Sequence, residues 1–594
     1  MQIAAPVVPE NLITLQPCPK GYTLDQDKAC SPEQTVERFH ERLRASGLDI
    51  LKEIRRIDNG RLDIPVYFSV CGAEAWRVIG NKKQMGKGSS PEQSRASACM
   101  ELAERFSFFS FLKNPSRFLV GDYQEMESLG YPVLPIQTLL ASVHDTSHSP
   151  QVLREMLAGI PLRWVWARRL SDMSPWLVPF SWFYAINEFN GPAAGNTTEE
   201  AVLQGICEVV ERHVCAIVSR EERQVPEIGL DSITEPVAAR LVEKFHTHGI
   251  HLHLFDFSLD TGIPTVAALA WDPATFPETS EIVFTAGTTP DANKAVIRAI
   301  TEVAQLAGDF NSSSNYVASG LPKPGSLGEV AYLLKKEKSE TVPLLSLRDL
   351  SHADILEEVR ACTNALAQQG LEVFVVNTTH ADLQIPAVYT IVPGAHFRER
   401  AMGGNAVLFA AKLASSLLAG EALQEKLAAM LAFAPDEYSL YFYQGRERYE
   451  DGEPEAAIPY LHNALALPCA EEDLPYIYSY LGCCLRDLGR FDEAITALQQ
   501  GLACDEERAD LHNAMGVCLF KLNRYDEAAM HFQRAVMLDP SSAIDYANLA
   551  LNLEKTGRLD EARRNYATAL ALDNSIAFAS EHLAALEAEQ TGEL

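Results

Sequence analysis

Hydrophobic residues recur with two different spacings over the first two thirds of the chain. Short apolar runs predict β-strands at residues 64–70, 251–256 and 373–376. A serine followed by proline at residue 31 opens a helical pattern that runs to residue 43. Longer helical patterns cover residues 91–112, 198–220, 291–307 and 401–419. This mixture predicts an α+β body that extends from about residue 31 to about residue 397.

The last part of the chain is helical and repetitive. The tetrapeptide Phe-Asp-Glu-Ala at 491–494 returns as Tyr-Asp-Glu-Ala at 525–528 and as Leu-Asp-Glu-Ala at 559–562, in steps of 34 residues. Small residues keep the same step at Gly482, Gly516 and Ala550, and a less regular copy lies earlier, at residues 455–456. This period resembles the tetratricopeptide repeat, an all-α helix-turn-helix solenoid that binds peptides or partner proteins. A rigid prop for a dimer is the alternative.

These patterns predict four regions along the chain. Residues 1–27 are expected to form an irregular arm, and residues 28–400 a catalytic domain. Residues 401–434 are expected to form connecting helices, and residues 435–594 the repeat domain. A chain of 594 residues is long enough for two to four domains.

Composition and charge narrow the classes of partner. The net charge of −30 argues against nucleic acid and against an anionic membrane surface. Residues 435–594 contain 29 acidic and 12 basic residues. No apolar run approaches the ~20 residues of a membrane span, and the N-terminus lacks the basic start of a secretory signal. The 12 cysteines include no Cys-x-x-Cys pair, which favours buried thiols in a reducing cytoplasm.

Two of the predicted helices contain the same sequence, Glu-x-x-Glu-Arg. It comprises Glu101, Glu104 and Arg105 in the first helix, and it returns at 208–212 in the second. Residues three apart share a helix face, so each helix presents two neighbouring carboxylates, which repel each other. Mg²⁺ binds carboxylate oxygens and keeps positions for phosphate and water. The pattern therefore predicts a site for metal-bound phosphate.

Each of these helices follows a loop suited to anions. Gly86-Lys87-Gly88 permits close backbone approach and supplies one positive charge, but it is not a Walker A loop because Lys87 is followed by glycine. Asn196 begins the second helix and can offer an amide to a cation or to phosphate. Thr197 and Glu200 are spaced as a capping box, so Glu200 is either a helix cap or a ligand.

A third predicted helix places Arg298 and Glu302 four residues apart on one face. Taken alone, this pair would be a surface ion pair worth ~0.3–0.5 kcal/mol. The order Gly-Lys-Gly, Ser-x-x-x-Glu-x-x-Glu-Arg, Gly-Asn-Thr-x-Glu-Glu, Glu-x-x-Glu-Arg and Arg-x-x-x-Glu, however, resembles the YcaO family. The resemblance covers most of the chain from residue 28 to about residue 397.

The resemblance implies a site for ATP and Mg²⁺ between the three helices. It implies that Arg212 and Arg298 neutralise phosphate charge and that Glu302 orients or coordinates. Ser97 matches a family serine, and Lys28 and Thr35 match N-terminal nucleotide contacts by spacing. It also implies a shell of metal and phosphate ligands at Glu101, Glu104, Asn196, Glu200, Glu208 and Glu211.

The resemblance further implies an enzyme that phosphorylates a peptide amide oxygen after a nucleophile adds to the amide carbon. Azoline-forming members commonly end in a proline-rich tail, whereas this chain ends in Gln-Thr-Gly-Glu-Leu. That difference favours thioamide formation or a role as accessory factor in methylthiolation of ribosomal protein S12. A nucleotide-binding scaffold without turnover and a peptide-binding adaptor are the alternatives. We expect a protein or peptide substrate, a partner bound by the repeats, and a homodimer.

Overall fold

The computed structural model describes residues 12–81, 83–311, 321–334, 341–397 and 405–591. The chain divides into two compact units. The first contains residues 1–154 and 161–406, and the second contains residues 155–160 and 407–594. The boundary predicted between residues 400 and 401 lies outside the described residues, and the other predicted domain boundaries stay predictions.

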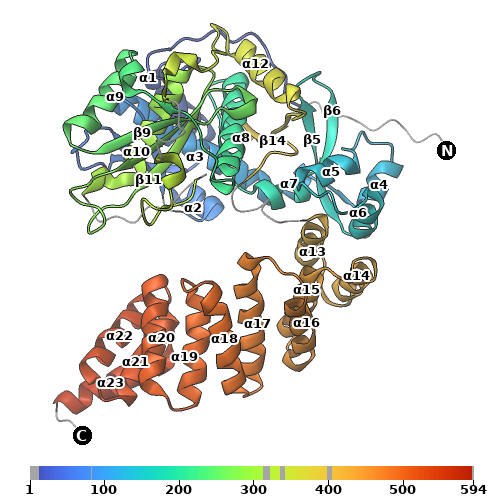
Figure 1. Cartoon of the computed structure of the whole chain (residues 1–594), viewed down its shortest axis with the longest axis vertical. Coiled ribbons are helices and arrows are strands. Elements are labelled where there is room, and N and C mark those ends of the chain that lie inside the picture. Colours follow the sequence, from blue (N-terminus) through green and yellow to red (C-terminus); the bar gives the residue numbers. More distant parts are fainter. Residues whose placement is uncertain (1–11, 82, 312–320, 335–340, 398–404, 592–594) are drawn as a thin grey trace. The chain divides into compact units, whose positions relative to one another are not determined.

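The first unit combines three β-sheets with helices (Figure 1), which confirms the predicted α+β body. One sheet has the order β1-β2-β3, and another has the order β11-β10-β9-β8-β12. The third has the order β4-β5-β13-β14-β7, with β6 paired to β5. The strands are β1 (Leu51–Arg56), β2 (Val66–Cys71), β3 (Lys83–Lys87), β4 (Leu119–Gly121), β5 (Leu162–Arg169), β6 (Pro175–Pro179), β7 (Pro192–Ala194), β8 (Glu227–Ile228), β9 (His251–Asp256), β10 (Thr265–Trp271), β11 (Val283–Thr288), β12 (Thr341–Val342), β13 (Phe374–Asn377) and β14 (Ala387–Ile391).

The helices around these sheets agree with the apolar patterns in the sequence. The predicted helix at residue 31 is α1, and its N-cap Ser31 forms a capping box with Gln34. The helices of the body are α1 (Pro32–Ser46), α2 (Ala73–Ile79), α3 (Pro91–Lys113), α4 (Tyr123–Ser128), α5 (Ile136–Ser142), α6 (Pro150–Leu157), α7 (Phe180–Asn187), α8 (Thr198–Arg220), α9 (Pro236–Thr247), α10 (Ala292–Ala307), α11 (Ala331–Leu334) and α12 (Ile355–Gln368).

The strand predicted at residues 64–70 begins two residues later, at Val66. Its start follows Pro65, whose nitrogen carries no hydrogen for a ladder bond. The other two predicted strands are present as β9 and β13. The helix predicted at 401–419 is α13 (Ala406–Leu417), and its predicted start lies outside the described residues.

Two glycines hold strands close to the helices that they support. A Cβ atom on Gly287 of β11 would lie 2.7 Å from the Ala295 oxygen and the Ala299 nitrogen of α10. A Cβ atom on Gly86 of β3 would likewise lie too close to the backbone nitrogen of Ala98 in α3. These contacts require glycine, because a side chain would push the strand from the helix. They fix the faces of α3 and α10 that carry the predicted site residues.

A stack of three imidazole rings joins distant segments of the first unit near residue 396. The rings of His144 and His396 are stacked 3.8 Å apart, and His213 of α8 lies 5.3 Å from His396. The His396 backbone N–H donates to His213 Nδ1 at 2.9 Å. Burial, followed by the neighbouring His144, lowers the pKa of His213 to about 4 and that of His396 to about 3. The stack is therefore uncharged at neutral pH.

The second unit is all helical, as predicted. Consecutive helices pack as antiparallel pairs (Figure 1), and their small and large apolar residues form one core. Gly482, Gly516 and Ala550 lie on helices α17, α19 and α21, where the helices of each repeat touch. The helices are α13 (Ala406–Leu417), α14 (Gly420–Phe433), α15 (Tyr438–Glu450), α16 (Pro454–Ala466), α17 (Leu474–Asp487), α18 (Phe491–Cys504), α19 (Ala509–Lys521), α20 (Tyr525–Leu538), α21 (Ala543–Lys555), α22 (Leu559–Leu572) and α23 (Ala577–Thr591).

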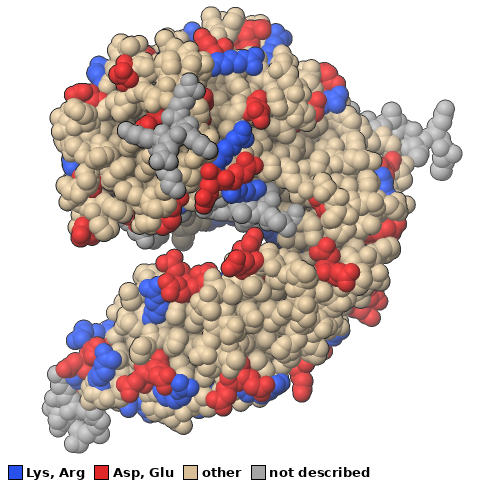
Figure 2. All heavy atoms as spheres, viewed as in Figure 1, with Lys and Arg blue, Asp and Glu red and all other residues tan. Residues whose placement is uncertain are grey.

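The surface of the second unit mixes both signs of charge. Figure 2 shows acidic and basic side chains interspersed along its helices. None of the helices in the described part of the chain is both long and apolar enough to span a membrane.

Candidate nucleotide and metal site

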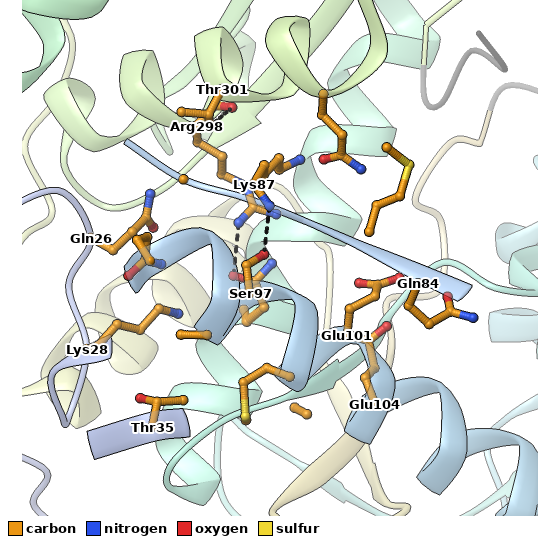
Figure 3. A pocket seen from close by; sticks show the side chains of 18 of the residues that line it. Gln26, Lys28, Thr35, Gln84, Lys87, Ser97, Glu101, Glu104, Arg298 and Thr301 are labelled. Carbon is orange, nitrogen blue, oxygen red and sulfur yellow. Dashed lines mark hydrogen bonds between the residues drawn. The ribbon is translucent and has the colours of Figure 1, made fainter. Parts of the chain in front are cut away.

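A cavity of about 620 Å³ lies in the first unit, between α3, α8, α10, β3 and the N-terminal arm. Its lining includes every residue that the sequence suggested for the site. Figure 3 shows Gln26, Lys28 and Thr35 toward one end of the cavity and Gln84, Glu101 and Glu104 toward the other. The predicted residues that it brings together are Lys28, Thr35, Lys87, Ser97, Glu101, Glu104, Asn196, Glu200, Glu208, Glu211, Arg212, Arg298 and Glu302.

Helix α8 contributes a row of side chains along one face. Glu200, Gln204, Glu208 and Glu211 follow one another at steps of four, four and three residues, and all line the cavity. Helical periodicity places such positions on one side of a helix. Thr197 caps the helix by accepting the Glu200 backbone N–H at 3.2 Å. Helix α8 therefore begins at the cavity and presents three carboxylates to it.

Helix α3 adds the second pair of carboxylates. Arg105 Nε donates to Glu101 Oε1 at 3.0 Å and lies 3.5 Å from Glu104 Oε1. Arg105 therefore partners the carboxylates of its own helix. It offsets part of the negative charge at this end of the cavity.

Burial raises the pKa of three carboxyl groups in the cavity. Burial and, next, Glu101 raise the pKa of Glu104 well above its ordinary value. Burial raises the pKa of Glu208 to about 7 against the opposing effect of Arg212, and burial also raises that of Glu211. Such shifts show that the ionised forms lack compensation within the protein. A bound cation would supply it.

Two arginines lie near the Glu211 carboxylate but beyond hydrogen-bond distance of it. Arg212 Nη1 lies 3.6 Å from Glu211 Oε1, and Arg298 Nε lies 3.7 Å from Glu211 Oε2. Three buried atoms of these side chains make no hydrogen bond within the described residues, namely Arg212 Nε, Arg298 Nε and Glu211 Oε2. Unsatisfied charged groups are costly, so the cavity is arranged for a charged ligand.

Lys87 reaches across the cavity to α10. Its ammonium pairs with Glu302, and its backbone N–H donates to Ser97 Oγ at 3.3 Å. Burial acts to raise the pKa of Glu302, but Lys87 and Arg212 outweigh burial and lower it. Gly86 and Lys87 end strand β3, so the predicted loop is wrong at these two positions. The positive charge of Lys87 is nevertheless held at the cavity by a carboxylate that also lines it.

The N-terminal arm, taken here as residues 12–31 before α1, lines the other end of the cavity. The Ala29 backbone N–H donates to Glu200 Oε2 at 3.0 Å, and Lys28 Nζ lies 3.7 Å from Glu200 Oε1. Asn196 Nδ2 also donates to Glu200, at 3.2 Å and 3.3 Å. The predicted capping box is therefore wrong in its second half, because the Glu200 carboxylate binds the arm instead of the backbone of its own N-cap.

The arm is itself anchored to the body. Lys20 Nζ donates to Asp27 at 2.8 Å and to the buried Glu358 of α12 at 2.6 Å. Lys294 Nζ donates to the carbonyls of Thr23 and Leu24 at 2.8 Å and 2.6 Å. These contacts fix the arm where Lys28 and Cys30 line the cavity.

The residues present fit Mg²⁺ together with a phosphate-bearing ligand. The donors are carboxylate oxygens, which Mg²⁺ prefers, beside two arginines suited to phosphate. Within the described residues, no three His, Cys, Asp or Glu side chains converge closely enough to hold a metal by themselves. Mg²⁺ bound through one or two carboxylates plus phosphates and water needs no such convergence.

Several cavity residues were missed by the sequence analysis. Gln204 accepts a hydrogen bond from Arg298 Nη1 at 3.1 Å. Its position between Glu200 and Glu208 on one helix face could have revealed it. Thr301 and Gln305 share the face of Glu302 and could have been found in the same way. Gln84, on strand β3, had no such signal.

Comparisons with known proteins identify the class. A family model described as YcaO cyclodehydratase, ATP- and Mg²⁺-binding, matches residues 85–396, so the chain belongs to the YcaO family. ATP and Mg²⁺ are accordingly its cofactors. A tetratricopeptide-repeat model matches residues 481–543.

The individual proteins that are similar to this chain have low sequence identity to it. An uncharacterized protein of Methanothermobacter thermautotrophicus is 28% identical over 380 residues, which are 62% of this chain and 94% of that protein. The ribosomal protein S12 methylthiotransferase accessory factor YcaO of Escherichia coli is 30% identical over 153 residues, 26% of this chain and 25% of that protein. A solved heterocyclase, in complex with substrate and cofactor, is similar in fold with a TM-score of 0.52 and 23% identity, over 65% of this chain and 55% of that chain.

Proposed function

We propose that this chain is an enzyme that uses ATP and Mg²⁺ to activate a backbone amide of a peptide for attack by a nucleophile. The observation that carries the proposal is the cluster of buried carboxylates and incompletely paired arginines around one cavity. When bound, ATP supplies the phosphoryl group that converts an amide oxygen into a leaving group, and Mg²⁺ screens its charge. Thioamidation or a related backbone change is the proposed outcome.

The side chains of the cavity have separate tasks in this proposal. Glu101, Glu104, Glu208 and Glu211 hold the cations and fix their positions. Arg212 and Arg298 face the charge that develops on the transferred group, where positioned charge lowers the barrier most. Lys28, Thr35, Ser97 and Asn196 contact the nucleotide. Glu200 fixes Lys28 and the arm, which excludes water from that end.

The direct test is ATP turnover with Mg²⁺ by the full chain. Glu208→Gln and Arg298→Ala should each abolish turnover, whereas Glu527→Gln, on an exposed helix of the repeats, should leave it unchanged. Nucleotide binding without turnover in the presence or absence of added peptides would favour the alternative of a nucleotide-binding scaffold. Failure to bind nucleotide would contradict the proposal.

A role as accessory factor in methylthiolation of ribosomal protein S12 is the second candidate. The partial similarity to the Escherichia coli factor supports it. The measurement is the mass of S12 from cells with and without this protein. An unchanged methylthiolation level would exclude this role and leave amide activation untouched.

The repeat unit is proposed to bind the protein substrate or a partner enzyme. The match of residues 481–543 to a tetratricopeptide-repeat model supports this, because such solenoids present extended concave surfaces for binding. We also propose that the chain acts as a homodimer in the cytoplasm, which sedimentation and cell fractionation would test.

A further inference from the structure

The two ends of the cavity differ in the chemistry of their lining. The arm end and the centre contain Lys28, Glu200 and the two arginines near Glu211 described above. Toward β3 and the last turns of α10, the lining includes the neutral side chains Asn81, Gln84, Thr301 and Gln305. Neutral amides offer one carbonyl acceptor and two N–H donors without net charge, which matches a peptide group.

Strand β3 runs along this end of the cavity as the edge of a sheet. The sheet order is β1-β2-β3, and within the described residues β3 pairs with β2 alone. Lys83, Gln84, Met85 and Lys87 of β3 all line the cavity, and Figure 3 shows the strand crossing it between α3 and α10. An edge strand presents N–H and C=O groups that can pair with another extended chain.

Gln84 provides an independent observation at the same place. The residue is 8% exposed, and its Nε2 atom makes no hydrogen bond within the described residues. A buried amide donor without an acceptor is unfavourable. An acceptor supplied by a ligand would remove that cost.

The cations at this end are already engaged, which argues against an anionic ligand there. The Lys83 ammonium lies 4.1 Å from the centre of the Phe68 ring, and Arg105 donates to Glu101 at 3.0 Å. The carboxylates of Glu101 and Glu104 also lie toward this end (Figure 3), and they would repel an anion. The neutral polar groups there are the amides and the strand edge. Their common complement is an uncharged, extended main chain.

We propose that the β3 edge, together with Gln84 and Gln305, binds an extended segment of the peptide substrate through its main chain. The amide to be activated then lies beside the carboxylates and arginines at the centre of the cavity. This inference rests on the proposed function, because it assigns the place of the peptide in that reaction. It makes substrate recognition at this site depend on peptide groups more than on side chains.

The test uses a capped, fluorescent ten-residue Thr-Ala peptide and the full chain, with and without Mg²⁺ and a non-hydrolysable ATP analogue. Two further peptides are N-methylated at odd or at even positions. An extended strand turns alternate N–H groups toward one neighbour, so one methylated peptide should bind about tenfold more weakly and the other unchanged. Equal binding of both methylated peptides, or no binding of the parent peptide, would overturn the inference.

Hydrogen exchange then locates the bound peptide. Amides of β3 should gain protection, whereas those of β1, the opposite edge of the same sheet, should not. Gln84→Met and Gln305→Met should each weaken peptide binding about fivefold, the effect of one neutral hydrogen bond. Gln368→Met, on the exposed end of α12, is the control. Protection confined to the repeat unit, or no effect of either cavity variant, would contradict the proposal.

The same samples separate this inference from the proposed function. Normal binding of the ATP analogue without β3-dependent peptide binding would overturn the inference and leave the nucleotide site in place. Peptide binding at β3 without any nucleotide binding would support the docking edge and contradict the ATP-dependent function.

Discussion

The cavity and the repeat unit use arginine–glutamate pairs in opposite ways. In the cavity, Arg212 and Arg298 lie 3.6 Å and 3.7 Å from the buried Glu211. In the repeats, the pairs are exposed, three residues apart, and closed to 2.6 Å, 2.6 Å and 2.7 Å. These pairs are Arg490–Glu493, Arg524–Glu527 and Arg558–Glu561.

The difference shows that a short ion-pair distance is a poor guide to importance. Water and dissolved ions compete for exposed charges, so an exposed pair adds little stability even when it is closed. Buried charges left partly uncompensated lower stability, so their presence indicates a ligand that completes them. The loose pairs of the cavity therefore matter more for function than the tight pairs of the repeats.

The largest expected effect comes from breaking the cavity cluster. Arg298→Ala should reduce kcat/KM for ATP about 100- to 1000-fold, because it removes charge positioned at the transferred group. The measurement is steady-state turnover together with nucleotide affinity. Arg298→Lys retains the charge but not the planar guanidinium and should recover only part of the loss. Wild-type turnover by Arg298→Ala would place the chemistry elsewhere.

The repeat unit should instead be sensitive to packing. A Cβ atom on Gly482 would lie 2.5 Å from Leu498, which is fully buried. Gly482→Val should therefore lower the free energy of unfolding of this unit by ~1–3 kcal/mol, and Gly482→Ala by less. Urea unfolding of the full chain measures this, and nucleotide affinity should not change. If both variants were as stable as the wild type, the close contact between the two helices would be contradicted.

Acid should weaken the body through its histidine stack. An unfolded histidine has a pKa of ~6.5, so the unfolded chain binds more protons than the folded chain as pH falls toward about 4. Stability should therefore fall between these values. His213→Gln should flatten the fall, as measured by urea midpoints across pH. An unchanged slope would show that the stack does not control acid stability.

The smallest expected effect is at an exposed pair of the repeats. Glu527→Gln should lower the free energy of unfolding only slightly, and added salt should remove the difference. Chemical unfolding at low and high ionic strength measures both. A loss as large as that of Gly482→Val would mean that these pairs act as a network along the solenoid.

The sequence predicted features that depend on neighbours along a helix. Glu101, Glu104, Glu208 and Glu211 could be recognised because spacing alone assigns them to a face. Three predicted helices also proved to line one cavity, although only resemblance to a family brought them together. The detailed roles of the site residues stay predictions.

Contacts between distant segments could not be predicted. Glu200 accepts from Ala29, 171 residues earlier, so spacing indicated a capping box that does not form. His144, His213 and His396 meet only after the sheets assemble, and no short-range pattern links them. Gln84 lies on a strand whose edge position depends on the whole sheet order.

The division of the chain into two compact units determines where it can be truncated. Residues 155–160 belong to the second unit although they lie within the sequence of the first, and Lys426 Nζ donates to the Glu155 carbonyl at 3.0 Å. A deletion of everything after residue 406 would therefore strip this hexapeptide of its packing partners. A fragment that contains the first unit is better prepared by ending the chain at residue 406 and also replacing residues 155–160 with a polar linker.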